Sequence, residues 1–234
     1  GGGMRHARYV MIDEVQDYSA AQLMCLARYF GKAHFMMLGD ENQAIREGTA
    51  SFDEIREVFT RACGSVDNCE LMTSYRSSPE ITALFTSLLD NEERVRVESV
   101  QPAGIEPVII ECADDLDYEV QLKTAVEEAL EARCLAAIIA PDARRLAKLE
   151  QLLEDLPVVT GAGKETMPEH GVLLLDIKLA KGLEFDQVIV PDAGNRSYPD
   201  ETLARHRLYT AISRATKKVT LVANGKLTKL LPGK

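Results

Sequence analysis

Apolar segments of strand length alternate with segments of helical period along most of the chain. The clearest helical period joins Ile81, Leu84, Phe85, Leu88 and Leu89. Such alternation predicts an α/β fold in which helices cover both faces of a parallel sheet. The predicted strands span residues 9–12, 34–38, 108–111, 136–139, 172–175, 187–190 and 218–222.

Local signals predict where several helices begin. Ser19 and Gln22 have the spacing of a capping box at the start of one helix. Ser78 and Pro79 have the usual order of a cap followed by a proline at the first helical position. We also expect a helix over residues 52–59, short strands over 69–72 and 158–159, a loop over 91–107, and a helix over 207–215.

The composition narrows the class of protein. The chain has 234 residues with 46% hydrophobic and 27% charged residues, as in soluble globular proteins. No apolar run approaches the roughly 20 residues that cross a bilayer, so we expect no membrane contact. A net charge of −10 argues against a protein that coats nucleic acid by bulk charge. The five cysteines include no C-x-x-C pair, which favours reduced thiols and a cytoplasmic location.

Two adjacent carboxylates, Asp13 and Glu14, directly follow the first apolar strand. Nucleotides bind beyond the carboxyl ends of strands in open α/β sheets, so acidic side chains at this point can serve phosphate chemistry. The first carboxylate suits a Mg²⁺ ion and the second suits an attacking water. The alternative is a core strand that runs into a solvated turn.

Other polar residues stand where predicted elements begin or end. The second strand closes in Gly39-Asp40, and Gln43 offers an amide that can orient water or contact a phosphate. Arg76 precedes a helix and carries a planar charged group suited to phosphate oxygens. An ordinary surface turn and an ordinary helix entry are the alternatives for these two places.

Two later segments also contain residues that suit contacts to a ligand. Gly182 allows a loop to approach a ligand closely, and Glu184 can accept a hydrogen bond from a sugar hydroxyl. Arg214 follows a predicted helix and can project as an arginine finger, although a basic helix end is also favourable to the helix dipole.

The order of these segments is more specific than any one of them. Asp-Glu-x-Gln-Asp, Gly-Asp-x-x-Gln, Tyr-Arg-Ser, Lys-Gly-Leu-Glu-Phe-Asp and Tyr-x-x-x-Ser-Arg-Ala occur in this sequence in one chain. The series resembles motifs II to VI of superfamily 1 helicases of the UvrD/Rep type, over residues 9–222. The resemblance implies a P-loop NTPase of RecA-like fold, with one complete domain and the end of a preceding one. Residues 1–72 would belong to the first domain and residues 73–234 to the second.

The resemblance also implies roles for residues that match the motifs, since ATP with Mg²⁺ sits between two RecA-like domains in that family. Asp13 resembles the Mg²⁺ ligand and Glu14 the general base that activates water. Gln43 resembles the γ-phosphate sensor. In the second domain, the implied contacts are Tyr75 on adenine, Arg76 and Arg214 on the γ-phosphate, and Glu184, in the loop of Gly182, on the ribose.

The sequence departs from the family at the phosphate-binding loop. In Gly161-Ala162-Gly163-Lys164-Glu165, the first glycine position of a P-loop holds Val158 and the hydroxyl position holds Glu165, so the segment is not a P-loop. We therefore expect the phosphate-binding loop upstream, in a missing N-terminal part of the same protein. We also expect this fragment to be inactive alone, as the C-terminal motor portion of an ATP-dependent DNA helicase or translocase.

Further departures concern the partner. Asp176 and Lys178 occupy the places where the family has Thr and His, and an aspartate there would repel a DNA phosphate. The short segment between Tyr75 and Lys181 leaves no room for a large accessory domain, which looks more like the HelD branch. The expected partners are therefore single-stranded or duplex DNA, or RNA polymerase. A fragment that acts only as a binding module is a further alternative.

Overall fold

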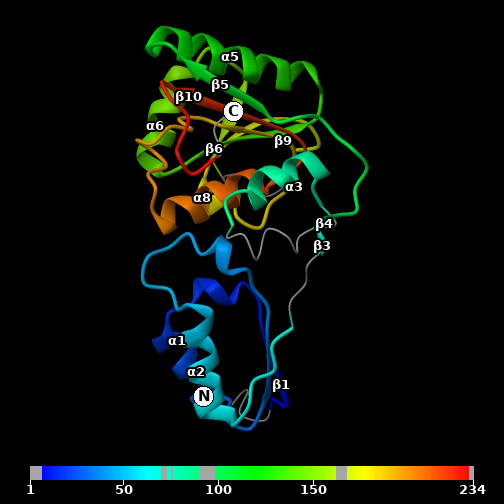
Figure 1. Cartoon of the computed structure of the whole chain (residues 1–234), viewed down its shortest axis with the longest axis vertical. Coiled ribbons are helices and arrows are strands. Elements are labelled where there is room, and N and C mark those ends of the chain that lie inside the picture. The colour runs from blue at the N-terminus through cyan, green and yellow to red at the C-terminus, as the bar shows by residue number, and fades with distance from the viewer. Residues whose placement is uncertain (1–6, 70–72, 75, 90–97, 162–167, 232–234) are drawn as a thin grey trace. The chain divides into compact units, whose positions relative to one another are not determined.

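The computed structural model describes residues 7–69, 73–74, 76–89, 98–161 and 168–231. The chain divides into two compact units, Gly1–Leu71 (unit 1) and Met72–Lys234 (unit 2), and Figure 1 shows their elements. Every helix within the described ranges is too short or too polar to cross a lipid bilayer.

Unit 1 contains a small parallel sheet and two helices. Strand β1 (Tyr9–Ile12) pairs in parallel with β2 (His34–Met37), with Tyr9 opposite His34. Helices α1 (Ala20–Tyr29) and α2 (Phe52–Cys63) pack on this sheet, and short 3₁₀ turns span Val15–Asp17 and Glu41–Gln43. The buried core consists of Ile12, Val15, Leu23, Ala27, Ala50, Ile55 and Phe59, and the partly buried Phe35 and Met37 of β2 pack against it.

Capping boxes begin both helices of unit 1. The Gln22 backbone N–H donates to Ser19 Oγ at 3.4 Å, and the Ser19 backbone N–H donates to Gln22 Oε1 at 2.8 Å, so the predicted box is confirmed. Ser51 and Glu54 form an equivalent box at the start of α2. Helix α2 continues past the predicted end at residue 59 as far as Cys63. It ends there because Gly64 follows with a positive φ of 92°, which glycine adopts readily.

Unit 2 is built on a six-stranded parallel sheet with the order β5-β10-β9-β6-β8-β7, which confirms the predicted α/β class. The strands are β5 (Val108–Cys112), β6 (Leu135–Ala140), β7 (Val158–Thr160), β8 (Gly171–Asp176), β9 (Phe185–Val190) and β10 (Ala215–Asn224). The helices are α3 (Pro79–Thr86), α5 (Asp115–Glu131), α6 (Ala143–Leu152), α7 (Ile177–Ala180) and α8 (Thr202–Ile212).

Helices cover both faces of this sheet, as Figure 1 shows for α5 on one side and α3 and α8 on the other. The face under α5 and α6 buries Leu122 and Val126 of α5 and Leu149 of α6 against Ile138 and Leu174 of the strands. The central strand β6 is buried along almost its whole length. Continuous burial is expected for a parallel strand, because helices exclude water from both of its faces.

The structure corrects three local predictions. The expected loop at 91–107 includes β4 (Glu98–Ser99), which pairs in parallel with β3 (Thr73–Ser74). Of the strand expected at 69–72, Cys69 lies in no strand and residues 70–72 lie outside the described residues. The helix expected over 207–215 ends at Ile212, because Ala215 pairs with Phe185 and so joins the sheet.

Candidate functional site

The first group of candidate residues lies at the carboxyl ends of β1 and β2 in unit 1. Asp13 and Glu14 follow β1 directly, and Gln43 lies in the turn after β2. The two strands are parallel, so their carboxyl ends meet at one edge of the sheet. The Glu14 N–H donates to Asp13 Oδ1 at 2.9 Å, and Glu14 adopts a left-handed backbone conformation with φ 51°.

A buried amide connects these two strand ends. Gln16, of which only 1% is exposed, donates from Nε2 to Glu14 Oε2 at 2.5 Å. Its Oε1 accepts a hydrogen bond from the Asp40 backbone N–H at 3.2 Å. Asp40 Oδ2 in turn accepts from Gln43 Nε2 at 2.9 Å. The Glu14 carboxylate and the Gln43 amide therefore belong to one hydrogen-bonded chain.

The residues of this edge fit a Mg²⁺ ion that is shared with a phosphate. Within the part of the chain that the structure describes, no three His, Cys, Asp or Glu side chains form a ready metal site. Mg²⁺ is usually held by one or two carboxylates together with substrate phosphates and waters, so Asp13 is a sufficient protein ligand.

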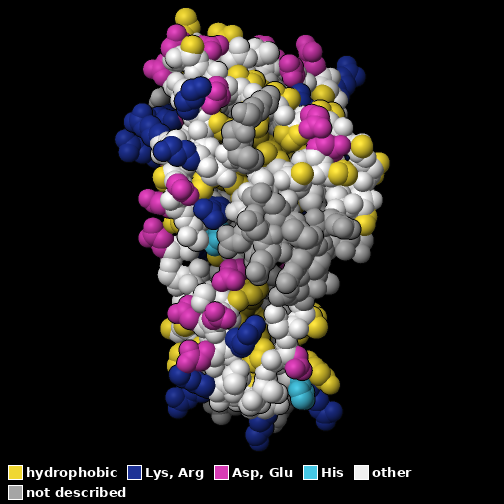
Figure 2. Space-filling view, viewed as in Figure 1, with side chains coloured by type: hydrophobic (Ala, Val, Ile, Leu, Met, Phe, Trp, Pro, Cys, Tyr) yellow, Lys and Arg dark blue, Asp and Glu magenta, His cyan; other side chains and the backbone are white. Residues whose placement is uncertain are grey.

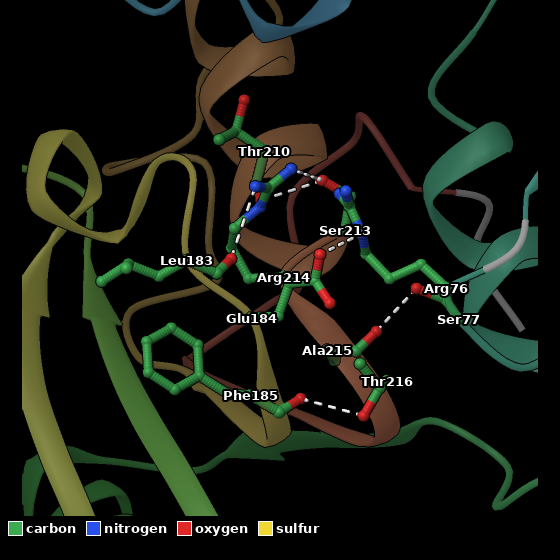
Figure 3. A network of polar contacts seen from close by, with 10 residues as sticks. All are labelled: Arg76, Ser77, Leu183, Glu184, Phe185, Thr210, Ser213, Arg214, Ala215 and Thr216. Atoms are coloured by element: carbon green, nitrogen blue, oxygen red, sulfur yellow. Dashed lines mark hydrogen bonds and ion pairs between the residues drawn. The ribbon is translucent and has the colours of Figure 1, made fainter. Parts of the chain in front are cut away.

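The second group of candidate residues lies at the amino ends of strands β9 and β10 in unit 2 (Figure 3). Glu184 directly precedes β9 and Arg214 directly precedes β10, and the two strands are parallel neighbours. Ser77 attaches the segment before α3 to this edge, since its Oγ donates to the Ala215 carbonyl at 2.7 Å. The backbone N–H of Ser78 also donates to the Thr216 carbonyl at 3.2 Å.

Arg76 and Glu184 form an ion pair at this edge. Arg76 Nε lies 2.5 Å from Glu184 Oε1, and the side chains are 46% and 47% exposed. Figure 3 shows the two side chains approaching each other from different segments of unit 2. A half-exposed pair contributes about 1 kcal/mol or less to stability, so ligand groups can replace either partner at little cost.

Arg214 is buried, with 2% of its surface exposed. Its guanidinium donates to the carbonyls of Thr210 at 3.3 Å and Leu183 at 3.4 Å, and to Ser213 Oγ at 3.2 Å. Leu183 lies in the loop in which Gly182 takes φ 82°, a conformation that favours glycine. Arg214 therefore holds the Lys-Gly loop in place through its hydrogen bond to the Leu183 carbonyl.

The structure thus gathers the candidates into two sets, one in each unit. Asp13, Glu14 and Gln43 form the set of unit 1, whereas Arg76, Glu184 and Arg214, with the loop of Gly182, form the set of unit 2. Tyr75 lies outside the described residues.

Sequence reasoning gave no role to Gln16 or Asp40. The sequence pattern that could have identified them is the presence of polar residues directly after apolar strands, in Asp-Glu-x-Gln and in Gly-Asp.

Comparisons with known families match both ends of the motif series. Residues 4–47 match the family described as the UvrD/REP helicase N-terminal domain. Residues 171–222 match the family described as the UvrD-like helicase C-terminal domain. The first match includes the edge of Asp13 and Gln43, and the second includes Glu184 and Arg214. A search of curated proteins found no match.

Solved structures give a similar picture. The C-terminal domain of a possible DNA helicase from Lactobacillus plantarum WCFS1 is 30% identical, with a TM-score of 0.56 over 67% of this chain and 91% of that domain. The helicase of PRRSV is 14% identical with a TM-score of 0.50, over 91% of this chain and 34% of that protein. The second similarity concerns the fold alone.

Proposed function

Because the chain belongs to the UvrD-like helicase family, we propose that it is the C-terminal motor portion of an ATP-dependent superfamily 1 DNA helicase or translocase. The observation that carries the proposal is the position of the motif residues within each unit. Carboxylates and an amide lie at the carboxyl edge of one parallel sheet, and at the amino edge of the other Arg76 pairs with Glu184 while Arg214 binds the neighbouring Leu183 carbonyl. Phosphoryl transfer needs this combination of metal ligand, base and positive charge.

In the proposed reaction, the residues of unit 1 serve the metal and the attacking water. When bound, ATP with Mg²⁺ supplies the phosphoryl group and neutralises part of its charge. Asp13 would hold the ion, and Glu14 would accept a proton from the water that attacks the γ-phosphate. Gln43 presents its amide to the same region and distinguishes a triphosphate from a diphosphate.

The motif residues of unit 2 are also proposed to contact nucleotide. Arg76 and Arg214 stabilise the charge that develops on the γ-phosphate, because guanidinium groups bind phosphate oxygens in a fixed geometry. Glu184 accepts a hydrogen bond from the ribose, Gly182 allows close approach of the loop, and Tyr75 stacks on the adenine. Arg76 is paired with Glu184, so nucleotide binding would exchange this pair for two contacts to the ligand.

An exposed apolar face supports the proposal that the missing N-terminal part of the protein completes unit 1. Tyr9 and Met11 of β1 are 76% and 68% exposed, and Met36 of β2 is 53% exposed. In the parallel register, Met36 lies opposite Met11, so the three side chains share one face of the sheet. Parallel sheets are normally covered on both faces, and the upstream part that carries the phosphate-binding loop would supply this cover.

The proposed partner is DNA, bound through local basic groups. The chain has a net charge of −10, and the face in Figure 2 shows small groups of Lys and Arg separated by acidic and neutral surface. A second candidate function is remodelling or release of RNA polymerase by a HelD-type ATPase, which the short segment between Tyr75 and Lys181 favours. Stimulation of ATP turnover by DNA supports the first function, and stimulation by RNA polymerase alone supports the second.

The substitution Glu14→Gln tests the proposed function in the full-length protein. We expect ATP binding to remain within about threefold of the parent and turnover to fall by about 10²-fold or more, since the general base is removed. Binding is measured with a fluorescent nucleotide and turnover by phosphate release. Glu47→Gln, at an exposed glutamate of the same unit, is the matched control. Normal turnover in Glu14→Gln would contradict the assigned role.

The remaining alternative is that this fragment serves only as a binding module. An ATPase assay on the fragment alone addresses it, because no P-loop sequence is present in residues 1–234. We expect no turnover above background from the fragment and robust turnover from the full-length protein. Hydrolysis by the fragment alone would place the phosphate-binding groups within these residues.

A further inference from the structure

We infer that Gln16 is a positioning residue that makes Glu14 and Gln43 act as one unit, an inference that rests on the proposed ATPase function. Gln16 touches neither the nucleotide nor the water in this scheme. Its side chain instead joins the strand end that carries the general base to the turn that carries the phosphate sensor.

The chemistry of the Gln16 amide suits both of its contacts. Nε2 donates to the Glu14 carboxylate at 2.5 Å, and Oε1 accepts from the Asp40 N–H at 3.2 Å. A carboxylate at position 16 would have no proton to donate to Glu14, and an apolar side chain could make neither bond. With only 1% of Gln16 exposed, water has little access to replace a lost bond.

The backbone around Gln16 is shaped to admit its side chain. A Cβ atom at Gly39 would lie 2.3 Å from Gln16 Oε1 and 2.9 Å from Val15 Cγ1. Any side chain at position 39 would therefore push the amide out of its place. Because Gly39 has no side chain, it allows the Gln16 side chain to lie close to the turn after β2, in addition to any role in the turn itself.

The connection continues from Asp40 to the sensor. Asp40 Oδ1 accepts from the Asn42 N–H at 2.9 Å and Oδ2 accepts from Gln43 Nε2 at 2.9 Å. The backbone N–H of Gln43 also donates to the Asp40 carbonyl at 3.0 Å. A shift of the Gln43 amide toward a phosphate therefore displaces Asp40, and Gln16 transmits the displacement to the Glu14 carboxylate.

The first test is Gln16→Met in the full-length protein, which keeps the length of the side chain and removes both hydrogen bonds. We expect kcat for ATP to fall by about 10²-fold, the usual effect of a small misplacement, while the KM changes less than about threefold. Gln22→Met, at a capping glutamine of the same unit, should leave kcat unchanged. A folded Gln16→Met protein with the kcat of the parent would overturn the inference.

A double-mutant cycle separates positioning from a general effect on the fold. If Gln16 acts through Glu14, Gln16→Met should lower turnover no further once Glu14→Gln is present. A second loss of about 10²-fold in the double variant would instead mean that Gln16 acts independently of Glu14. Normal turnover in Glu14→Gln alone refutes the proposed function, whereas normal turnover in Gln16→Met alone refutes only this inference.

A substitution at Gly39 tests the same contact without changing the Gln16 residue itself. Gly39→Ala should reproduce the loss of kcat by displacing the amide. Gly31→Ala is the control, since a Cβ there meets only the carbonyls of Ala27 and Arg28 at 3.6 Å. Parental kcat in both glycine variants would show that the close approach at Gly39 has no role in turnover.

Discussion

Arg214 illustrates how a single side chain can combine two tasks. Its buried guanidinium satisfies the carbonyls of Thr210 and Leu183, so it holds the Lys-Gly loop against the end of α8. The same group is proposed to stabilise charge on the γ-phosphate. A planar group with five N–H donors can keep its contacts to the protein through some donors and offer others to a ligand.

The substitution Arg214→Ala should therefore have two separate effects. If Arg214 acts as proposed, turnover in the full-length protein should fall by about 10³-fold or more, the loss typical of an arginine finger. The free energy of unfolding of residues 1–234 should fall by about 2 kcal/mol, because buried carbonyls lose their donors. Phosphate release and urea denaturation measure the two effects. Arg205→Ala, which removes a surface pair with Asp200, should change stability by less than about 1 kcal/mol. Unchanged stability in Arg214→Ala would argue against the bracing role.

Three strands of unit 2 are joined at their amino ends by Asp186, the second residue of β9. Its carboxylate accepts from the Leu135 N–H at the start of β6 at 3.2 Å, and it pairs with Lys217 of β10 at 2.7 Å. The hydrogen bond from Lys217 is the main reason that the pKa of Asp186 lies below its usual value, with a smaller contribution from Leu135. The same pair raises the pKa of Lys217.

This lowered pKa predicts how stability depends on pH. The contribution of Asp186 is present above the unfolded-state pKa of about 3.9 and is lost as the pH falls through the lower folded-state pKa. Asp186→Asn should therefore be less stable than the parent at pH 7, by about 1 kcal/mol or less because Lys217 is 70% exposed. The difference in the free energy of unfolding between Asp186→Asn and the parent should become smaller toward pH 3. Urea denaturation at pH 7, 5 and 3 provides the comparison, and a gap of constant size would contradict the prediction.

The two units differ in how completely they bury their sheets. In unit 2, helices cover both faces of six strands, and the residues of β6 from Ala136 to Ala140 have no exposed surface. In unit 1, one face of the β1–β2 pair exposes Tyr9, Met11 and Met36. A two-stranded sheet with one uncovered face contributes little independent stability.

We therefore expect residues 72–234 to fold without residues 1–71. This piece should show one cooperative thermal transition by circular dichroism, whereas residues 1–71 alone should melt gradually or associate through the exposed apolar face. The matched comparison is the chain of residues 1–234 under the same conditions. A non-cooperative transition for residues 72–234 would mean that the core of unit 2 depends on residues outside it.

Much of the fold could be predicted because it depends on local patterns. Apolar runs identified most strands to within a few residues, and the capping residues Ser19 and Ser78 marked the starts of α1 and α3. The errors occurred where distant pairing overrides local pattern. Glu98–Ser99 joins β3 although its surroundings read as a loop, and Ala215 leaves a helical pattern to pair with Phe185.

The amino-acid sequence alone determined the order of the motifs and the chemical groups that each motif carries, because these depend only on residue type and spacing. The tertiary structure alone decided which of those groups are exposed and which are linked. Gln16 became a bridge because β1 and β2 lie side by side in parallel, which brings Asp40 within reach of its amide. Arg214 became a buried brace because α8 and β10 enclose it at the loop of Leu183. Both outcomes depend on contacts between residues that are far apart in the chain, which no local pattern encodes.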